Sequence, residues 1–206
     1  MLEVLFSDPY FLAVTKPGGV PSQRDHSNDP CVLDLARDQE HGELGLPHRL
    51  DRPVSGVMVL TRTAAALSRI SELFAEGEVK KTYWAIVEGE PDASGEWEHR
   101  LVQHGRTRKA RVSEDAIKGR SARLRFERLV QGERFALLAL HPDRGLFHQL
   151  RAQCAAAGHP IKGDVKYGAR RGEPDRTICL HARSIAFVHP FTNEHMGVDE
   201  KKQAGE

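Results

Sequence analysis

The chain of 206 residues lacks several features that would place it in a large class of proteins. No apolar run approaches the roughly 20 residues of a membrane-spanning helix. The N-terminus carries Glu3 and Asp8 and has no basic leader before an apolar stretch, so we expect no cleaved signal peptide. Only three cysteines are present and no C-x-x-C pair occurs, which disfavours a disulfide framework and a structural zinc site. We therefore expect a soluble, cytoplasmic protein with three reduced cysteines, Cys31, Cys154 and Cys179.

Common cofactor and nucleophile motifs are also missing. The sequence has no Walker A loop, no dinucleotide-binding G-x-G-x-x-G, no G-x-S-x-G elbow and no H-E-x-x-H helix. Its 11 histidines are not spaced as metal ligands usually are. We expect neither a bound metal nor a nucleotide cofactor.

Positive charge is concentrated in one segment. The whole chain has 30 Lys and Arg against 29 Asp and Glu, but residues 100–128 hold ten basic residues against three acidic ones. Such a segment is typical of a phosphate-binding surface, and a solvated hairpin is the alternative. If it binds phosphates, we expect the contacts from Arg106, Arg108, Lys109 and Arg111, with Arg123 and Arg125 on the open face of a strand.

Short strand-like runs outnumber helical patterns. Strands are expected over 4–6, 11–14, 57–60, 83–87, 123–129, 135–140 and 185–188. Helices are expected over 32–40, over 63–75 with Gly77 as the C-cap, and over 147–157 before Gly158 and Pro160. Strands and helices do not alternate strictly, which favours an α+β fold on a mixed, mostly antiparallel sheet. With no linker visible, we expect one domain over 1–200 and a short polar tail over 201–206.

The segment HRLDRPVSG at 48–56 places an acid, Asp51, between Arg49 and Arg52 on a loop that runs into a strand. A carboxylate beside two guanidinium groups stays ionised, which suits catalysis. A structural ion pair that braces the loop is the alternative.

Two other segments are dense in polar and aromatic residues. KTYWAIVEG at 81–89 places Tyr83 at the start of an apolar strand, where core packing is the alternative role. RGLFHQLR at 144–151 leads into the third expected helix, and GHPIKGD and KYG follow it. Arg151 lies beside the apolar stripe of that helix, so we expect it to reach toward the sheet and meet a carboxylate.

In these segments the chain resembles the RluA-type pseudouridine synthases, which isomerise uridine in RNA. The family motif H-R-L-D-x-x-T-S-G is matched except at its Thr, which is Val54 here. The family's K-x-Y-x-A-x-V-x-G is matched by residues 81–89. The third segment supplies nearly all of the family motifs G-R-x-H-Q-[IL]-R, G-H-P-I-x-G-D and Y-G. The resemblance spans about residues 2–198. It implies the pseudouridine synthase fold, ribosomal or transfer RNA as the partner, no cofactor, and a monomer.

Carried over to this sequence, the resemblance makes Asp51 the catalytic carboxylate, Tyr83 the active-site tyrosine and Arg151 the partner of Asp51. Arg49 would help to flip the target base out of its stack. Further substrate contacts are expected from His48, Arg144, His148, Gln149 and Leu150. The chain departs from the family's Thr-Gly-Arg, having Arg144-Gly145-Leu146 in its place, which puts the substrate contacts there in question.

The reaction suits these residue types. Pseudouridine formation breaks the bond between ribose and a ring nitrogen and rejoins the uracil through carbon, so it needs no cofactor. An RNA-binding module without catalysis and a retaining glycoside hydrolase are the other functions considered. Retention of Asp51, Tyr83 and Arg151 argues against the first. A retaining glycoside hydrolase would need a second acid, and none accompanies Asp51 in the matched motifs.

Overall fold

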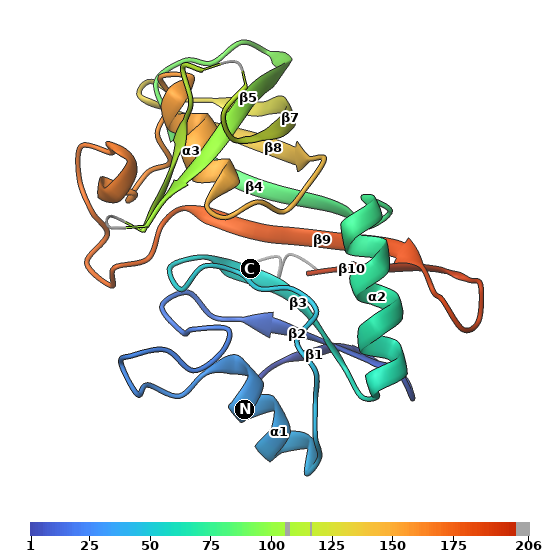
Figure 1. The fold of residues 1–206 in the computed structure, drawn as a ribbon. Helices are drawn as coiled ribbons and strands as arrows, with labels where there is room; N and C mark the ends of the chain where they lie inside the picture. Colours follow the sequence, from blue (N-terminus) through green and yellow to red (C-terminus); the bar gives the residue numbers. More distant parts are fainter. Residues whose placement is uncertain (106–107, 116, 201–206) are drawn as a thin grey trace. The chain divides into compact units, whose positions relative to one another are not determined.

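The computed structural model describes residues 1–105, 108–115 and 117–200, and these form ten strands, three α-helices and one short 3-10 helix. The chain divides into two compact units: residues 1–81 with 182–206, and residues 82–181 (Figure 1). The expected tail at 201–206 and the expected phosphate contact Arg106 lie outside the described residues. The prediction of one domain over 1–200 stays a prediction.

The first unit is built on strands in the order β1 (Val4–Ser7), β2 (Phe11–Lys16), β3 (Ser55–Thr61), β9 (Leu180–Val188) and β10 (His195–Asp199). β2 runs antiparallel to β1 and β3, and β10 antiparallel to β9. β2 and β3 are almost entirely buried, so their near-continuous apolar sequences are those of central strands. The register that pairs Lys16 with Gly56 brings the end of β2 to the start of β3.

Helix α2 (Ala64–Glu76) packs on this sheet, and α1 (Val32–Glu40) precedes β3 in the chain. The side chain of Thr63 caps α2 by accepting the Ala66 N–H, and Gly77 ends it with a left-handed φ of 80°. Ala66 and Ile70 of α2 join a core formed with β2, β3, β9 and β10. Both helices lie where the sequence pattern predicts them; in α2 the caps and the apolar stripe agree, whereas α1 has no side-chain cap.

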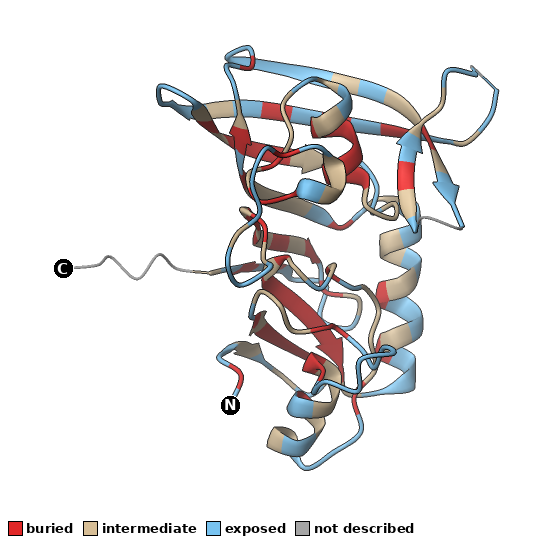
Figure 2. Ribbon diagram, turned by 90° about the vertical axis from the view of Figure 1, so that its left-hand side faces the viewer, coloured by how far each residue is buried: buried red, intermediate tan, exposed pale blue. Residues whose placement is uncertain are grey.

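The second unit has strands in the order β4 (Lys80–Glu88), β8 (Phe135–Pro142), β7 (Arg120–Gln131), β5 (Ser94–His104) and β6 (Lys109–Val112), every neighbour antiparallel. Helix α3 (Gln149–Ala156) contacts β5, β6 and β7, and the 3-10 helix η1 (Val165–Tyr167) follows it. Six successive residues of α3 are buried, 149–154, so this helix lies inside its unit, whereas α2 buries only one stripe (Figure 2).

α3 begins two residues later than predicted. His148 has a left-handed backbone (φ 50°), which breaks the helical repeat, and Phe147 therefore lies before the helix. The Gln149 side chain accepts the Leu146 N–H at 3.1 Å and so satisfies a donor at the helix start. Further along, Gln153 Nε2 donates to the carbonyl oxygens of Trp97 and Ala122, which ties the buried helix to β5 and β7.

The α+β class and the mostly antiparallel pairing are confirmed, and three strands were missed: β5, β6 and β10. The first half of β5 has no apolar alternation in the sequence, because Ser94, Gly95, Glu96 and Glu98 are exposed and Trp97 is only half-buried. In β10 the alternation of buried Met196 and Val198 is a signal that could have predicted the strand.

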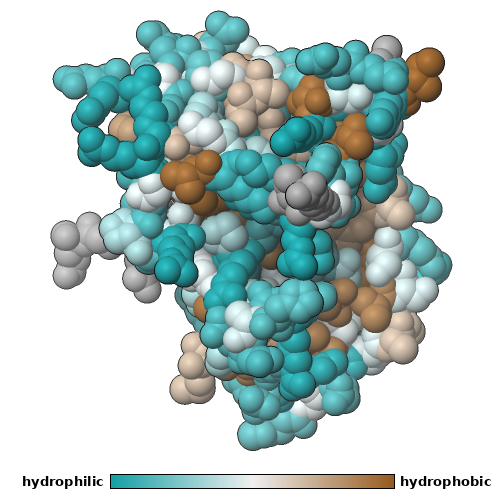
Figure 3. All heavy atoms as spheres, turned by 60° about the vertical axis from the view of Figure 1, so that its left-hand side comes forward, coloured by the Kyte–Doolittle hydropathy of each residue, from teal (hydrophilic) through white to brown (hydrophobic). Residues whose placement is uncertain are grey.

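None of the described helices is long and apolar enough to cross a membrane. The face drawn in Figure 3 carries mostly hydrophilic side chains, with hydrophobic side chains in smaller groups among them.

Gly56, the second residue of β3, has a conformation that other residues rarely adopt, with φ at +117°. A Cβ at this position would lie 2.3 Å from the carbonyl oxygen of Ala182 in β9. We expect Gly56→Ala to lower the free energy of unfolding by about 3 kcal/mol, through both backbone strain and the clash. Urea unfolding followed by circular dichroism measures this.

Gly197→Ala is the matched control. Gly197 lies in β10, and nothing comes within 4 Å of a Cβ built there. Its substitution should change the free energy of unfolding by less than about 0.5 kcal/mol. Equal stability of the two variants would contradict the role given to Gly56.

Candidate functional site

The loop that carries Asp51 is held from beneath by a buried ammonium group. Lys16, at the end of β2, is 0 % exposed. Its Nζ donates to three main-chain carbonyl oxygens, of Pro17 at 2.9 Å, Arg52 at 3.1 Å and Val54 at 2.5 Å. Burial lowers the pKa of Lys16 to about 8, and the nearby Asp51 carboxylate acts in the opposite direction.

A second clamp holds the residue before Asp51. The Ser22 hydroxyl donates to the carbonyl oxygen of Leu50 at 2.7 Å and accepts its N–H at 3.1 Å. The carbonyl oxygen of Asp51 accepts the N–H of Val54, which closes a turn. Backbone positions on both sides of Asp51 are therefore fixed.

The two arginines that flank Asp51 behave differently. Arg52 turns to the preceding loop, where its Nε donates to the Gly19 carbonyl oxygen and its Nη2 pairs with Asp29. It braces the loop, so the structural alternative considered for this motif applies to Arg52. Arg49 is exposed, as a residue that contacts RNA must be.

His48 has a structural contact. Its Nε2 accepts the N–H of Val59 in β3 at 2.9 Å, and its ring packs at 4.9 Å on Phe74 of α2. Burial, together with the positive charge of Lys81, lowers the pKa of His48 to about 3, so the ring is neutral and can accept this bond. The substrate contact expected of His48 stays a prediction.

In the second unit the centre of the candidate site is an ion pair between Arg151 and Asp164. Arg151 Nε lies 2.6 Å from Asp164 Oδ2, and Nη2 lies 2.7 Å from Oδ1. The two side chains are only 6 % and 1 % exposed. Such a bidentate pair fixes the plane of the guanidinium. Sequence reasoning expected Arg151 to meet a carboxylate but missed Asp164, although it lies in the quoted segment GHPIKGD.

The expected pairing of Arg151 with Asp51 stays a prediction, since the two residues belong to different units. Tyr83, the third expected catalytic residue, is half-buried in β4 and pairs in register with Leu140 of β8.

A tyrosine and a histidine complete the surroundings of Arg151. Tyr167 Oη accepts the N–H of Ala110 at 2.8 Å and lies 2.8 Å from His148 Nδ1. Arg151 Nη1 is 3.3 Å from His148 Nε2, and its guanidinium carbon lies 5.0 Å from the centre of the Tyr167 ring. Because arginine can only donate, Nε2 is an acceptor and Nδ1 carries the proton that His148 donates to Tyr167.

The remaining expected contacts lie around the start of α3. Gln149 and Leu150 are buried, and Gln149 Nε2 donates to the carbonyl oxygen of Arg123. Leu146, which replaces the family's arginine, packs on the apolar cluster beneath α3. Arg144 is exposed. Substrate contacts of Gln149, Leu150 and Arg144 stay predictions.

The structure divides the basic segment. Arg123 and Arg125 are exposed on β7 opposite buried Leu124 and Phe126, as predicted. Arg123 is nevertheless paired with Glu96 at 3.2 Å and reaches Glu98 at 4.0 Å, which sequence reasoning did not foresee. Its charge is thus balanced within the sheet, and its expected contribution to phosphate binding is reduced.

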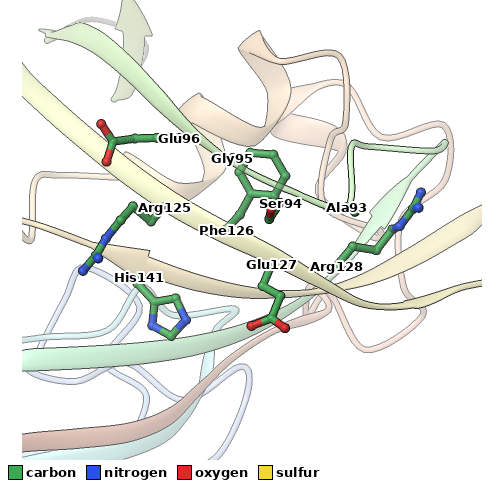
Figure 4. A pocket seen from close by; sticks show the side chains of 9 residues that line it. All are labelled: Ala93, Ser94, Gly95, Glu96, Arg125, Phe126, Glu127, Arg128 and His141. Carbon is green, nitrogen blue, oxygen red and sulfur yellow. The ribbon is translucent and has the colours of Figure 1, made fainter.

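An open hollow of about 960 Å³ lies on the side of β7 that carries Arg125. Figure 4 shows Arg125 near His141, with Glu96 and Glu127 also lining the hollow. Cationic and anionic side chains alternate there, so it does not select an anion. Within the described part of the chain, no group of three or more His, Cys, Asp or Glu side chains is placed to hold a metal ion.

Asp164→Asn keeps the shape of the side chain but leaves the buried Arg151 charge unpaired. We expect it to lower the free energy of unfolding by about 3 kcal/mol. The control is Glu72→Gln, which breaks an exposed pair with Arg69 and should cost under about 1 kcal/mol. Chemical denaturation of both variants tests this, and equal losses would contradict the importance of the buried pair.

Comparison with known proteins agrees with these features. The family model for RNA pseudouridylate synthase matches residues 10–156, a range that includes residues of both units. A tRNA pseudouridine synthase C from Vibrio parahaemolyticus is 33 % identical over 95 % of this chain and 88 % of its own length. An uncharacterised RNA pseudouridine synthase from Zymomonas mobilis is 35 % identical over 93 % of this chain and 91 % of its own.

Among solved structures, human RNA pseudouridylate synthase domain containing 1 superposes with a TM-score of 0.83 and 25 % identity, covering 98 % of this chain and 83 % of its own. The family match, the identity to curated relatives and the motif around Asp51, which departs from the family only at Val54, point the same way. The chain belongs to the RNA pseudouridylate synthase family and is an enzyme that isomerises uridine in RNA to pseudouridine.

Proposed function

We propose that this enzyme isomerises uridine in transfer RNA, with Asp51 as the catalytic carboxylate. The observation that carries the assignment of Asp51 is the fixed turn on which it lies, clamped by Lys16 and Ser22. A reacting carboxylate has to be placed before the substrate arrives, and a loop bonded on both sides of it supplies that placement. Transfer RNA is proposed because several relatives are named as tRNA pseudouridine synthase C.

The chemistry needs one ionised carboxylate near the bond between ribose and base. Asp51 could attack the anomeric carbon or the uracil ring, or stabilise positive charge on the ribose as the bond breaks. The uracil then turns and rejoins the ribose through a ring carbon, so all atoms of the nucleotide are retained. The buried ammonium of Lys16 lies close enough to Asp51 for the two charges to attract each other.

Arg151 is proposed as the cation that pairs with Asp51 during the reaction. Asp164 binds Nε and Nη2 of Arg151, which fixes the direction in which the third nitrogen, Nη1, points. The expected pair requires such a fixed direction, since a mobile guanidinium would lose entropy each time it bound. Asp164 therefore acts as a positioning residue for Arg151.

Tyr83 is proposed to stack on the target uracil and to move a proton through its hydroxyl group. Arg49 is proposed to assist the extrusion of the base, which costs about a few kcal/mol when a base leaves its stack. Its exposure on the loop beside Asp51 supports this role.

The substrate is tested by mapping pseudouridine in total RNA from a strain that lacks the gene. We expect a position in transfer RNA to lose its pseudouridine and to regain it when the wild-type gene returns. A loss confined to ribosomal RNA would overturn the transfer RNA proposal and keep the family reaction.

We further propose that the enzyme acts in the cytoplasm as a monomer. Cell fractionation would test the location, and light scattering would test the oligomeric state.

Asp51→Asn keeps the size of the side chain and removes its charge. We expect single-turnover isomerisation to fall at least about 1,000-fold, while RNA affinity changes less than about threefold, because the carboxylate acts on the reaction and not on binding. Rapid-quench assays and filter binding measure the two quantities. Near wild-type turnover in this variant would refute the assignment of Asp51.

Tyr83→Phe separates the ring from the hydroxyl group. If the ring stacks and the hydroxyl group moves a proton, the variant should bind RNA normally and isomerise it about 100-fold more slowly. Tyr10→Phe is a control, since Tyr10 stacks on exposed Phe191 and packs against the core of the first unit. Full activity of Tyr83→Phe would leave Tyr83 with a packing role only.

A further inference from the structure

Beside the Arg151 cluster lies a second hollow, of about 360 Å³, which we call the basic hollow. Residues of β6, α3 and η1 line it, namely Lys109, Ala110, Arg111, Val112, Ala152, Lys166, Tyr167 and Gly168. All of these belong to the second unit. We propose that the basic hollow binds a backbone phosphate of the RNA close to the target uridine, which rests on the function proposed above.

Charge is the first argument. Lys109, Arg111 and Lys166 bring three cations to the rim, and Lys166 lies outside the segment that the sequence singled out. β6, α3 and η1 carry no acidic residue. The nearest acid in the sequence, Asp164, is buried against Arg151, so its charge is already balanced. This differs from β7, where glutamates of β5 pair with Arg123.

Shape is the second argument. Ala110 and Ala152 are buried at 3 % and 4 % exposure, and their small side chains leave room for a group to enter. The Tyr167 ring lines the hollow, with Lys109 Nζ 5.9 Å from its centre. A compact anion fits such a recess, and lysine and arginine donate charge-assisted hydrogen bonds to phosphate oxygens.

Rigidity is the third argument. Tyr167 Oη accepts the Ala110 N–H, and Lys166 Nζ donates to the Arg108 carbonyl oxygen at 2.8 Å. The first bond joins η1 to β6 and the second joins η1 to the residue before β6, so the backbone positions of Lys109, Arg111 and Lys166 are held relative to one another.

Position relates the basic hollow to the reaction. Ala152 is the residue after Arg151 on α3, and Tyr167 contacts both His148 and Arg151. A phosphate bound there would lie next to the cluster that orients Arg151. The phosphodiester in question is therefore one within a few nucleotides of the target.

The test combines a triple variant, Lys109→Gln, Arg111→Gln and Lys166→Gln, with RNA that carries one neutral methylphosphonate at successive positions. For wild-type enzyme, one position near the target uridine should weaken binding about tenfold. In the triple variant the same methylphosphonate should change affinity less than twofold, because the partner cations are gone. The slope of log affinity against log salt should flatten by about 0.7–0.9 for one lost phosphate contact.

The matched control removes three exposed cations of the same unit outside the basic hollow, Arg134→Gln, Arg171→Gln and Arg176→Gln. It should keep the methylphosphonate effect in full. Loss of the effect in the control, or its persistence in the triple variant, would overturn the subsite. Arg111→Gln alone, at an exposed position, should reduce the effect partly and guards against misfolding of the triple variant.

These measurements report binding and not turnover, so they separate the subsite from the proposed function. Wild-type enzyme that shows the methylphosphonate effect but forms no pseudouridine in transfer RNA would overturn the substrate proposal and support the subsite. Pseudouridine formation in transfer RNA, without any position-specific methylphosphonate effect, would support the substrate proposal and overturn the subsite.

Discussion

The ammonium of Lys16 inside the first unit is the interaction on which the loop of Asp51 depends. Three carbonyl oxygens replace the water that this charge would otherwise bind, and two of them, those of Arg52 and Val54, belong to the loop itself. A buried charge with hydrogen-bonding partners on one loop fixes that loop, because releasing it would leave the charge unsatisfied. The turn at Asp51, the brace from Arg52 and the close approach of Gly56 to β9 are arranged around this constraint.

The second unit also contains a buried cation, but its partner is a charged carboxylate and not a set of carbonyl oxygens. There a carboxylate, Asp164, binds the guanidinium of Arg151 in two places, and the pair is buried together. Lys16 is bound by carbonyl dipoles, so its site keeps a net positive charge. The charges of Arg151 and Asp164 balance each other. A fixed positive charge thus lies beneath Asp51, while the guanidinium of Arg151 is oriented with little net field of its own.

Local signals in the sequence were enough for much of the fold. Thr63 and Gly77 delimit α2 through capping chemistry, and the apolar runs of β2 and β3 identify central strands. β5 was not predicted because its pattern depends on Phe126 in the neighbouring strand β7: a Cβ at Gly95 would lie 3.0 Å from the Phe126 ring, and Trp97 stacks on that ring at 4.2 Å. Such pairing lies between distant segments, so no local pattern reveals it.

In the candidate site, too, local motifs identified some residues, whereas contacts between distant segments could not be predicted. Asp51, Tyr83 and Arg151 were found from motifs, but the partners that orient them come from elsewhere in the chain. Asp164 is 13 residues from Arg151. Lys16 is 36 and 38 residues from the carbonyl oxygens of Arg52 and Val54 that it binds. The left-handed backbone of His148 could not be inferred either, since histidine seldom adopts it and only the bonds to Tyr167 and Arg151 show what it accomplishes.

The buried ammonium also links folding to proton exchange. Lys16 has a pKa of about 8 in the folded chain, against an ordinary value of 10.5. Between these values the folded protein has lost the proton that the unfolded chain still holds, so unfolding there takes up one proton. For this group, stability rises as pH increases through that window, and below pH 8 the folded chain bears the full cost of enclosing a charge. At neutral pH the enzyme therefore gives up part of its stability to keep a cation beneath its catalytic loop.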